Sequence, residues 1–117
     1  MYEGLVRRGH DVTVVHSADA FSLRSAAPAI PIEDPPGLHR VSIRSGFGAL
    51  TPVIVQQTRR PGLLRPALQR VLDAPCDVVH FHNVSLIGGP GVFPMSRAPV
   101  ILHTPHDHWL FCATHVL

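Results

Sequence analysis

The chain has 117 residues, 45% of them apolar and 15% charged, which is enough for one small globular domain with a single core. Its net charge of +2 is too small to indicate binding to nucleic acid. All ten basic residues are arginine, so catalysis through a Schiff-base lysine or a P-loop lysine is excluded.

The first elements predicted along the chain are a helix, a glycine turn and a strand. Residues 2–8 resemble the last turns of a helix, and Gly9 adopts at little cost the positive φ that ends one. Residues 11–16 are β-branched and almost continuously apolar, which predicts a strand buried on both faces of a parallel sheet. Residues 17–37 are rich in Ala, Ser and Pro, which predicts a surface loop.

The second half of the chain alternates between predicted strands and helical connections. Residues 38–44 alternate apolar and polar side chains, as an edge strand does. Apolar side chains recur at helical spacing from 61 to 72, and a second buried strand follows at 77–82. Residues 85–93 are expected to be a loop entering a glycine-weakened helix, before a last strand at 99–103. This order favours a parallel α/β sheet.

A sheet of this type normally opens with a strand ahead of its first helix, and that strand pairs centrally. The sequence begins inside the helix and ends without a closing helix, so we expect a domain truncated at both ends. Without the opening strand, the strands at 11–16 and 77–82 either pair directly or leave backbone groups unpaired.

Polar side chains gather directly after the last predicted strand. Ligands bind in open α/β sheets where parallel strands end, so this segment is the predicted working edge of the protein. It contains imidazoles, a carboxylate, an indole and a thiol, from His106, Asp107, His108, Trp109, Cys112 and His115.

Three blocks of the sequence resemble the N-terminal domain of a glycosyltransferase of family four, the retaining group with two facing Rossmann-like domains (the GT-B fold). They are residues 8–15, residues 76–83 and residues 104–112, the last being similar to the family's His-Asp-aromatic-Trp element. The resemblance implies that residues 1–117 form a partial acceptor-side domain of the N-terminal, subfamily 4-like type. The expected fold class is α/β, a partial Rossmann-like parallel sheet with flanking helices and its first strand missing.

The same resemblance implies roles for individual residues. His106 would face the cleft beside the transferred sugar, where an imidazole can orient a hydroxyl near neutral pH. Asp107 would fix the tautomer of His106 or cap the following helical turn, and both are the predicted catalytic residues. The predicted substrate-binding residues are His82, Asn83, Gly88, Gly89, His108 and Trp109.

Some of these residues also have ordinary structural explanations. Gly88 and Gly89 do not match a dinucleotide-binding glycine motif, and a tight turn close to the acceptor accounts for them. Trp109 could stack on a sugar, although anchoring a loop in the core is the commoner role of such a residue. His80 lies within a strand and is expected to be a packed core histidine, and Cys112 a small buried apolar group.

The full enzyme implied by the resemblance moves a sugar from a nucleotide-sugar donor to a hydroxyl of a sugar or lipid-linked acceptor. No cofactor is expected, because the nucleotide sugar is a co-substrate gripped mainly by a second domain. The resemblance also implies no metal, because retaining enzymes of this family generally need none. The chain alone is then expected to be inactive. Two alternatives stay open: a metal-binding or metal-dependent hydrolase module built on the C-terminal histidines, and a non-catalytic remnant.

The expected location is the cytoplasm. Cys76 and Cys112 stand far apart and lack the pattern of a secreted protein, and the N-terminus lacks the apolar core of a signal peptide. No run approaches the about 18 apolar residues that would span a bilayer. Peripheral contact with a membrane stays open.

Overall fold

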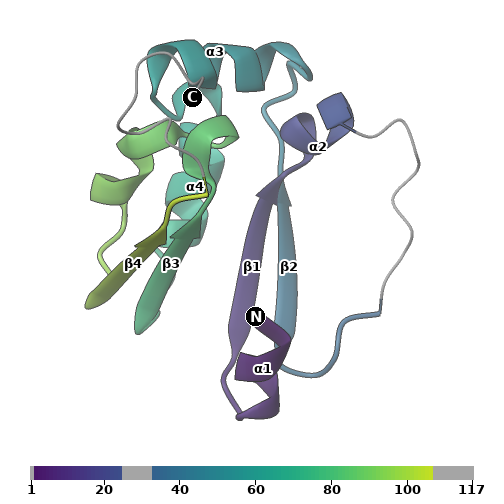
Figure 1. Ribbon diagram of the computed structural model, residues 1–117, viewed down its shortest axis with the longest axis vertical. Coiled ribbons are helices and arrows are strands. Elements are labelled where there is room, and N and C mark those ends of the chain that lie inside the picture. The colour runs from purple at the N-terminus through teal and green to yellow at the C-terminus, as the bar shows by residue number, and fades with distance from the viewer. Residues whose placement is uncertain (1, 25–32, 107–117) are drawn as a thin grey trace.

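The computed structural model describes residues 2–24 and 33–106 (Figure 1). The first half of the chain contains three helices and two strands: α1 (Tyr2–Arg7), β1 (Val12–Ser17), α2 (Ala18–Arg24), β2 (Leu38–Ile43) and α3 (Leu50–Thr58). The second half contains one α-helix, three 3-10 helices and two strands: η1 (Gly62–Leu64), α4 (Arg65–Leu72), β3 (Val78–His82), η2 (Val84–Leu86), η3 (Gly89–Met95) and β4 (Val100–Thr104). The predicted mixed α/β class is confirmed.

The strands form two parallel pairs instead of one sheet. β1 pairs with β2, with Val12 opposite Leu38, and β3 pairs with β4, with Val78 opposite Val100. β1 and β3 face each other across the space between the pairs, and neither bonds to the other (Figure 1). Of the two outcomes predicted for a sheet without an opening strand, the structure therefore has the second, in which edges lack strand partners.

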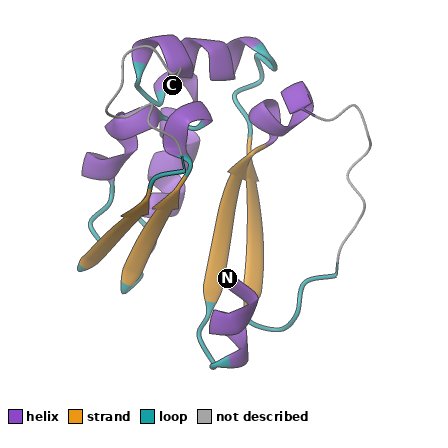
Figure 2. Ribbon diagram, in the orientation of Figure 1, coloured by secondary structure: helices purple, strands orange, loops and turns teal. Residues whose placement is uncertain are grey.

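The strand predicted at 11–16 to be buried on both faces has no buried residue between 12 and 16. The expectation that the strands at 77–82 and 99–103 are buried is also wrong. No residue of β3 or β4 is buried, and the Val78 side chain is 51% exposed. Figure 2 shows the reason, because the helices gather behind β3 and β4 and beyond the strand ends, and leave the other face of that pair open. Exposed apolar side chains on the pair are Val78, Val100, Ile101 and Leu102.

The hydrophobic core lies among α3, α4, the 3-10 helices and the end of β2. Leu64 is 0% exposed and Val55 and Val92 are each 1% exposed. The remaining buried members of the cluster are Ile43, Leu68, Val84 and Met95. This core fixes the segments that follow β3, and so it determines where the chain passes between β3 and β4.

Local pattern located most elements to within a residue or two, with instructive exceptions. The helix predicted over 61–72 begins as the 3-10 turn η1 and continues as α4. The glycine-weakened helix after β3 is present as η2 and η3. The predicted loop from residue 17 instead begins with α2, and α3 was not predicted.

Among residues 2–24 and 33–106, no helix is both long and apolar enough to cross a membrane.

Candidate functional site

The carboxyl ends of β3 and β4 form one rim, as neighbouring parallel strands require. β3 ends at His82 and is followed by Asn83, while β4 ends at Thr104 and leads within two residues to His106. The structure brings two predicted residues into contact here, with His82 Nδ1 3.1 Å from His106 Nε2. We call the carboxyl ends of β3 and β4, with Asn83 and His106, the β3–β4 rim.

His80 extends this contact along the strand. Its Nδ1 lies 3.3 Å from His82 Nε2, and its Nε2 lies 2.8 Å from Thr104 Oγ1. The rings of His80 and His82 are also tilted against each other, with centroids 3.9 Å apart. The His80 side chain is exposed, so the expectation of a packed core histidine is wrong. It lies on the open face of the pair, which none of the described helices covers.

His103 lies on the opposite face of the same strand pair. It is the register partner of Phe81, and its ring packs edge-on against Phe93 with centroids 4.9 Å apart. Phe93 in turn contacts Phe81. Because alternate residues of a strand point to opposite faces, His103 is separated from the chain of His80, His82 and His106.

Asn83 is held in place by the turn that it begins. Its φ is 41°, in the left-handed region that Asn tolerates better than most residues. Its Oδ1 accepts a 2.8 Å hydrogen bond from Ser85 Oγ, while its amide nitrogen makes no hydrogen bond among those described here. Asn83 is exposed, so it presents an amide at the β3–β4 rim.

Gly88 and Gly89 are buried, and they lie where the chain turns from η2 into η3. A Cβ on Gly88 would lie 2.2 Å from Val92 Cγ1 and 3.1 Å from Pro61 Cβ. Gly89 has a φ of 56°, which glycine adopts without steric cost. Close packing explains Gly88 and a left-handed backbone conformation explains Gly89, in agreement with the expectation of a tight turn here.

The remaining predicted site residues, Asp107, His108 and Trp109, lie outside the described residues, as do Cys112 and His115. Their predicted roles stay predictions.

A polar network that the sequence did not reveal lies at the carboxyl ends of β1 and β2. Asp19 is only 6% exposed, and its Oδ2 accepts hydrogen bonds of 2.8 Å from both the backbone N–H and the Oγ of Ser45. Ser45 Oγ also bonds Thr51 Oγ1, so the network joins α2, the end of β2 and α3. A carboxylate three residues after the strand predicted at 11–16 was the available signal.

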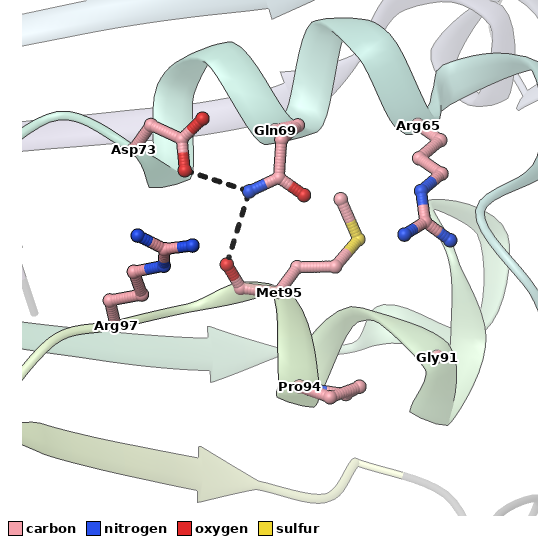
Figure 3. A pocket seen from close by; sticks show the side chains of 7 residues that line it. All are labelled: Arg65, Gln69, Asp73, Gly91, Pro94, Met95 and Arg97. Atoms are coloured by element: carbon pink, nitrogen blue, oxygen red, sulfur yellow. Dashed lines mark hydrogen bonds between the residues drawn. The ribbon is translucent and has the colours of Figure 1, made fainter.

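The two cavities described in the structure lie away from the β3–β4 rim. One, of about 390 Å³, lies between α4 and η3, and Figure 3 shows Gln69 between the side chains of Arg65 and Arg97. Gln69 Nε2 donates to Asp73 Oδ1 at 2.8 Å and to the Met95 carbonyl at 3.4 Å. The other is lined by residues just before β3 and β4. The cleft predicted beside His106 therefore stays a prediction.

Several imidazole rings lie close together at the rim, and they affect the pKa of His82. Burial lowers the pKa of His82 below its usual value, and the neighbouring His80, His106 and His103 lower it further. Each neighbouring ring opposes a second positive charge nearby. His82 is therefore neutral near pH 7 and has one N–H and one unprotonated nitrogen to share.

The contacts do not converge as metal ligands would. The two ring nitrogens of His82 lie on opposite sides of the ring, and each is occupied by a different histidine. Within the described part of the chain, no three His, Cys, Asp or Glu side chains are grouped to hold a metal ion. The metal-dependent alternative receives no support, and neither does the non-catalytic remnant.

The parallel strand pairs, with a polar cluster at the carboxyl ends of one pair, belong to an α/β domain. The model of Glycosyltransferase Family 4 matches residues 1–116, and the chain therefore belongs to this family. No curated protein and no solved structure matches the chain significantly. Family membership gives a glycosyltransferase-type function, with a sugar donor and an acceptor as the general substrates.

Proposed function

We propose that this chain forms the acceptor side of the cleft of a retaining glycosyltransferase of GT-B architecture. The enzyme moves a hexosyl group from a nucleotide sugar to a hydroxyl of a sugar or lipid-linked acceptor. The observation that carries this proposal is the placement of His106 and Asn83 at the ends of paired parallel strands in a member of the family. The donor is held mainly by a second domain, so residues 1–117 alone do not turn over.

His106 is the residue proposed to contact the reacting sugar. It is exposed at the β3–β4 rim, its Nε2 faces His82, and its Nδ1 is the nitrogen available to a hydroxyl. Asn83, also exposed, offers an amide from the neighbouring strand. Asp107 is proposed to support His106, and His108 and Trp109 to complete the acceptor site. Catalysis then depends on positioning and on stabilising the charge of the departing nucleotide. No metal or other cofactor is proposed.

The proposed cellular setting is the cytoplasm, with contact to a membrane surface. Cys76 is an exposed free thiol, which supports a reducing compartment. Helix α3 lies beyond the carboxyl ends of the strands, and the exposed apolar side chains Leu50, Val53 and Ile54 on it support contact with lipid or with a lipid-linked acceptor (Figure 1).

The test is His106→Ala in the complete enzyme that carries this chain, assayed with a panel of UDP-, GDP- and ADP-sugars. Loss of a hydrogen bond between a neutral imidazole and a sugar hydroxyl, worth about 0.5 to 1.5 kcal/mol, lowers kcat/KM by roughly 2- to 13-fold. The control is His10→Ala, an exposed histidine at the opposite end of β1. An unchanged kcat/KM in His106→Ala would refute the role of this residue.

The stereochemical part of the proposal has its own measurement. The anomeric configuration of the product, read from proton NMR couplings, is expected to equal that of the donor. An inverted product would overturn the retaining mechanism and leave the family assignment intact.

A further inference from the structure

Three imidazoles and one hydroxyl follow one another in a single file across the open face of β3 and β4. Thr104 Oγ1 is 2.8 Å from His80 Nε2, His80 Nδ1 is 3.3 Å from His82 Nε2, and His82 Nδ1 is 3.1 Å from His106 Nε2. We call these four residues the imidazole file. Counting contacts between described residues, the one ring nitrogen of the file without a partner is His106 Nδ1, at the β3–β4 rim.

The strand register builds this file. His80 and His82 are two residues apart on β3 and therefore share a face, and Thr104 lies directly opposite His82 on β4. His106 follows two residues later on the β4 side. Since His80, His82 and Thr104 come from two hydrogen-bonded strands, the order of these three side chains is fixed by backbone pairing.

The chemistry of neutral imidazole couples the members of the file. Each neutral ring carries one N–H and one lone pair, so a ring that donates on one side must accept on the other. If Thr104 donates to His80, every ring carries its proton on Nδ1 and His106 offers an N–H at the rim. If Thr104 accepts, every proton sits on Nε2 and His106 offers a lone pair.

We propose that His82 is a positioning residue for His106, and that His80 and Thr104 complete a file that sets which nitrogen of His106 carries the proton. Both nitrogens of His82 are engaged by other histidines, so His82 itself has none left for substrate. The use of His106 toward a sugar hydroxyl rests on the proposed function. The coupling between the members of the file is independent of the proposed function.

A count of protons limits the charge of the file. In the arrangement in which Thr104 accepts, one added proton binds to the free lone pair on His106 Nδ1. Each contact within the file then still contains a single hydrogen, and His106 presents Nδ1–H at the rim. A second added proton places two hydrogens in one contact and breaks it. The remaining imidazole of these strands, His103, lies on the other face against Phe93 and takes no part in the count.

The test reads the ring nitrogens directly, by ¹⁵N NMR of histidine-labelled full chain at neutral pH. His82→Phe keeps a ring and removes both nitrogens, and Thr104→Val keeps the branched shape and removes the hydroxyl. Each change removes a hydrogen bond worth about 0.5 to 1.5 kcal/mol, so the tautomer ratio of His106 is expected to change about two- to tenfold. The control, His103→Phe, retains a ring next to Phe93 and leaves the ratio unchanged.

The outcomes separate the two proposals. An identical tautomer ratio in the original chain, His82→Phe and Thr104→Val would overturn the imidazole file, even if His106→Ala abolished sugar transfer. A changed ratio together with full activity of His106→Ala would uphold the file and refute the proposed function. If His82→Phe does not fold, the more conservative Thr104→Val decides the question alone.

Discussion

At the scale of single residues, the face of the strand decides what each histidine does. His80, His82 and His106 are in contact on the open face, whereas His103 packs against Phe93 on the covered face. The sequence could place His82 and His106 near the same edge, because both follow or end predicted parallel strands. It could not predict the contact with His80, because that depends on which face of the pair the helices leave open.

The lowered pKa of His82 predicts a dependence of stability on pH. The folded state favours the neutral ring. At pH values between the folded-state pKa of His82 and its unfolded-state pKa of 6.5, unfolding is therefore accompanied by uptake of a proton. Stability contributed by the neutral ring is present above 6.5, declines as the pH falls below that value, and levels off below the folded pKa. The measurement is the urea midpoint between about pH 8 and pH 5.

Replacement of His82 by Phe is expected to flatten this pH profile, because the titrating ring is gone from both states. His10→Ala, which removes an exposed imidazole far from the rim, is expected to leave it unchanged. Identical slopes for the original chain and His82→Phe would show that His82 is not the group responsible.

At the scale of elements, sequence pattern found those whose stability is local and missed those that depend on packing. β3 and β4 were located to within one residue from their apolar runs. Helix α3 was missed because Pro52 and several β-branched residues disfavour a helix there, while burial of Thr51 and Val55 stabilises it. Helix α2, only seven residues long, lies in a segment whose composition indicated a loop.

The turn before α4 gives a direct measure of what the core contributes. Leu64 is 0% exposed, and its neighbour Leu63 is 43% exposed. Leu64→Ala leaves a cavity among α3, α4 and η3, and is expected to lower the free energy of unfolding by about 2 to 5 kcal/mol. Leu63→Ala is the matched control, with an expected loss well under half as large. Equal losses in chemical denaturation would contradict the position of the core.

At the scale of the whole molecule, the sequence predicted strands and their direction but not their neighbours. A buried apolar run indicates that a strand forms, but it does not indicate which strand lies beside it. In the structure β1 pairs with β2 and β3 pairs with β4. The difference arises because lateral pairing depends on segments distant along the sequence, and the described residues supply no strand between β1 and β3. In the described residues, the single sheet that we expected is therefore divided into two two-stranded sheets.

Open strand edges make this chain prone to self-association. Among the described residues, each strand has one edge without a strand partner, and such an edge beside exposed Val78 and Val100 is a template for a strand from another molecule. Sedimentation velocity is expected to reveal oligomers that grow with concentration, and Val78→Arg to suppress them by placing charge on the edge. Leu63→Arg, at an exposed apolar site outside the strands, is expected to have no such effect. A chain that stays monomeric at high concentration would mean that these edges are protected in solution.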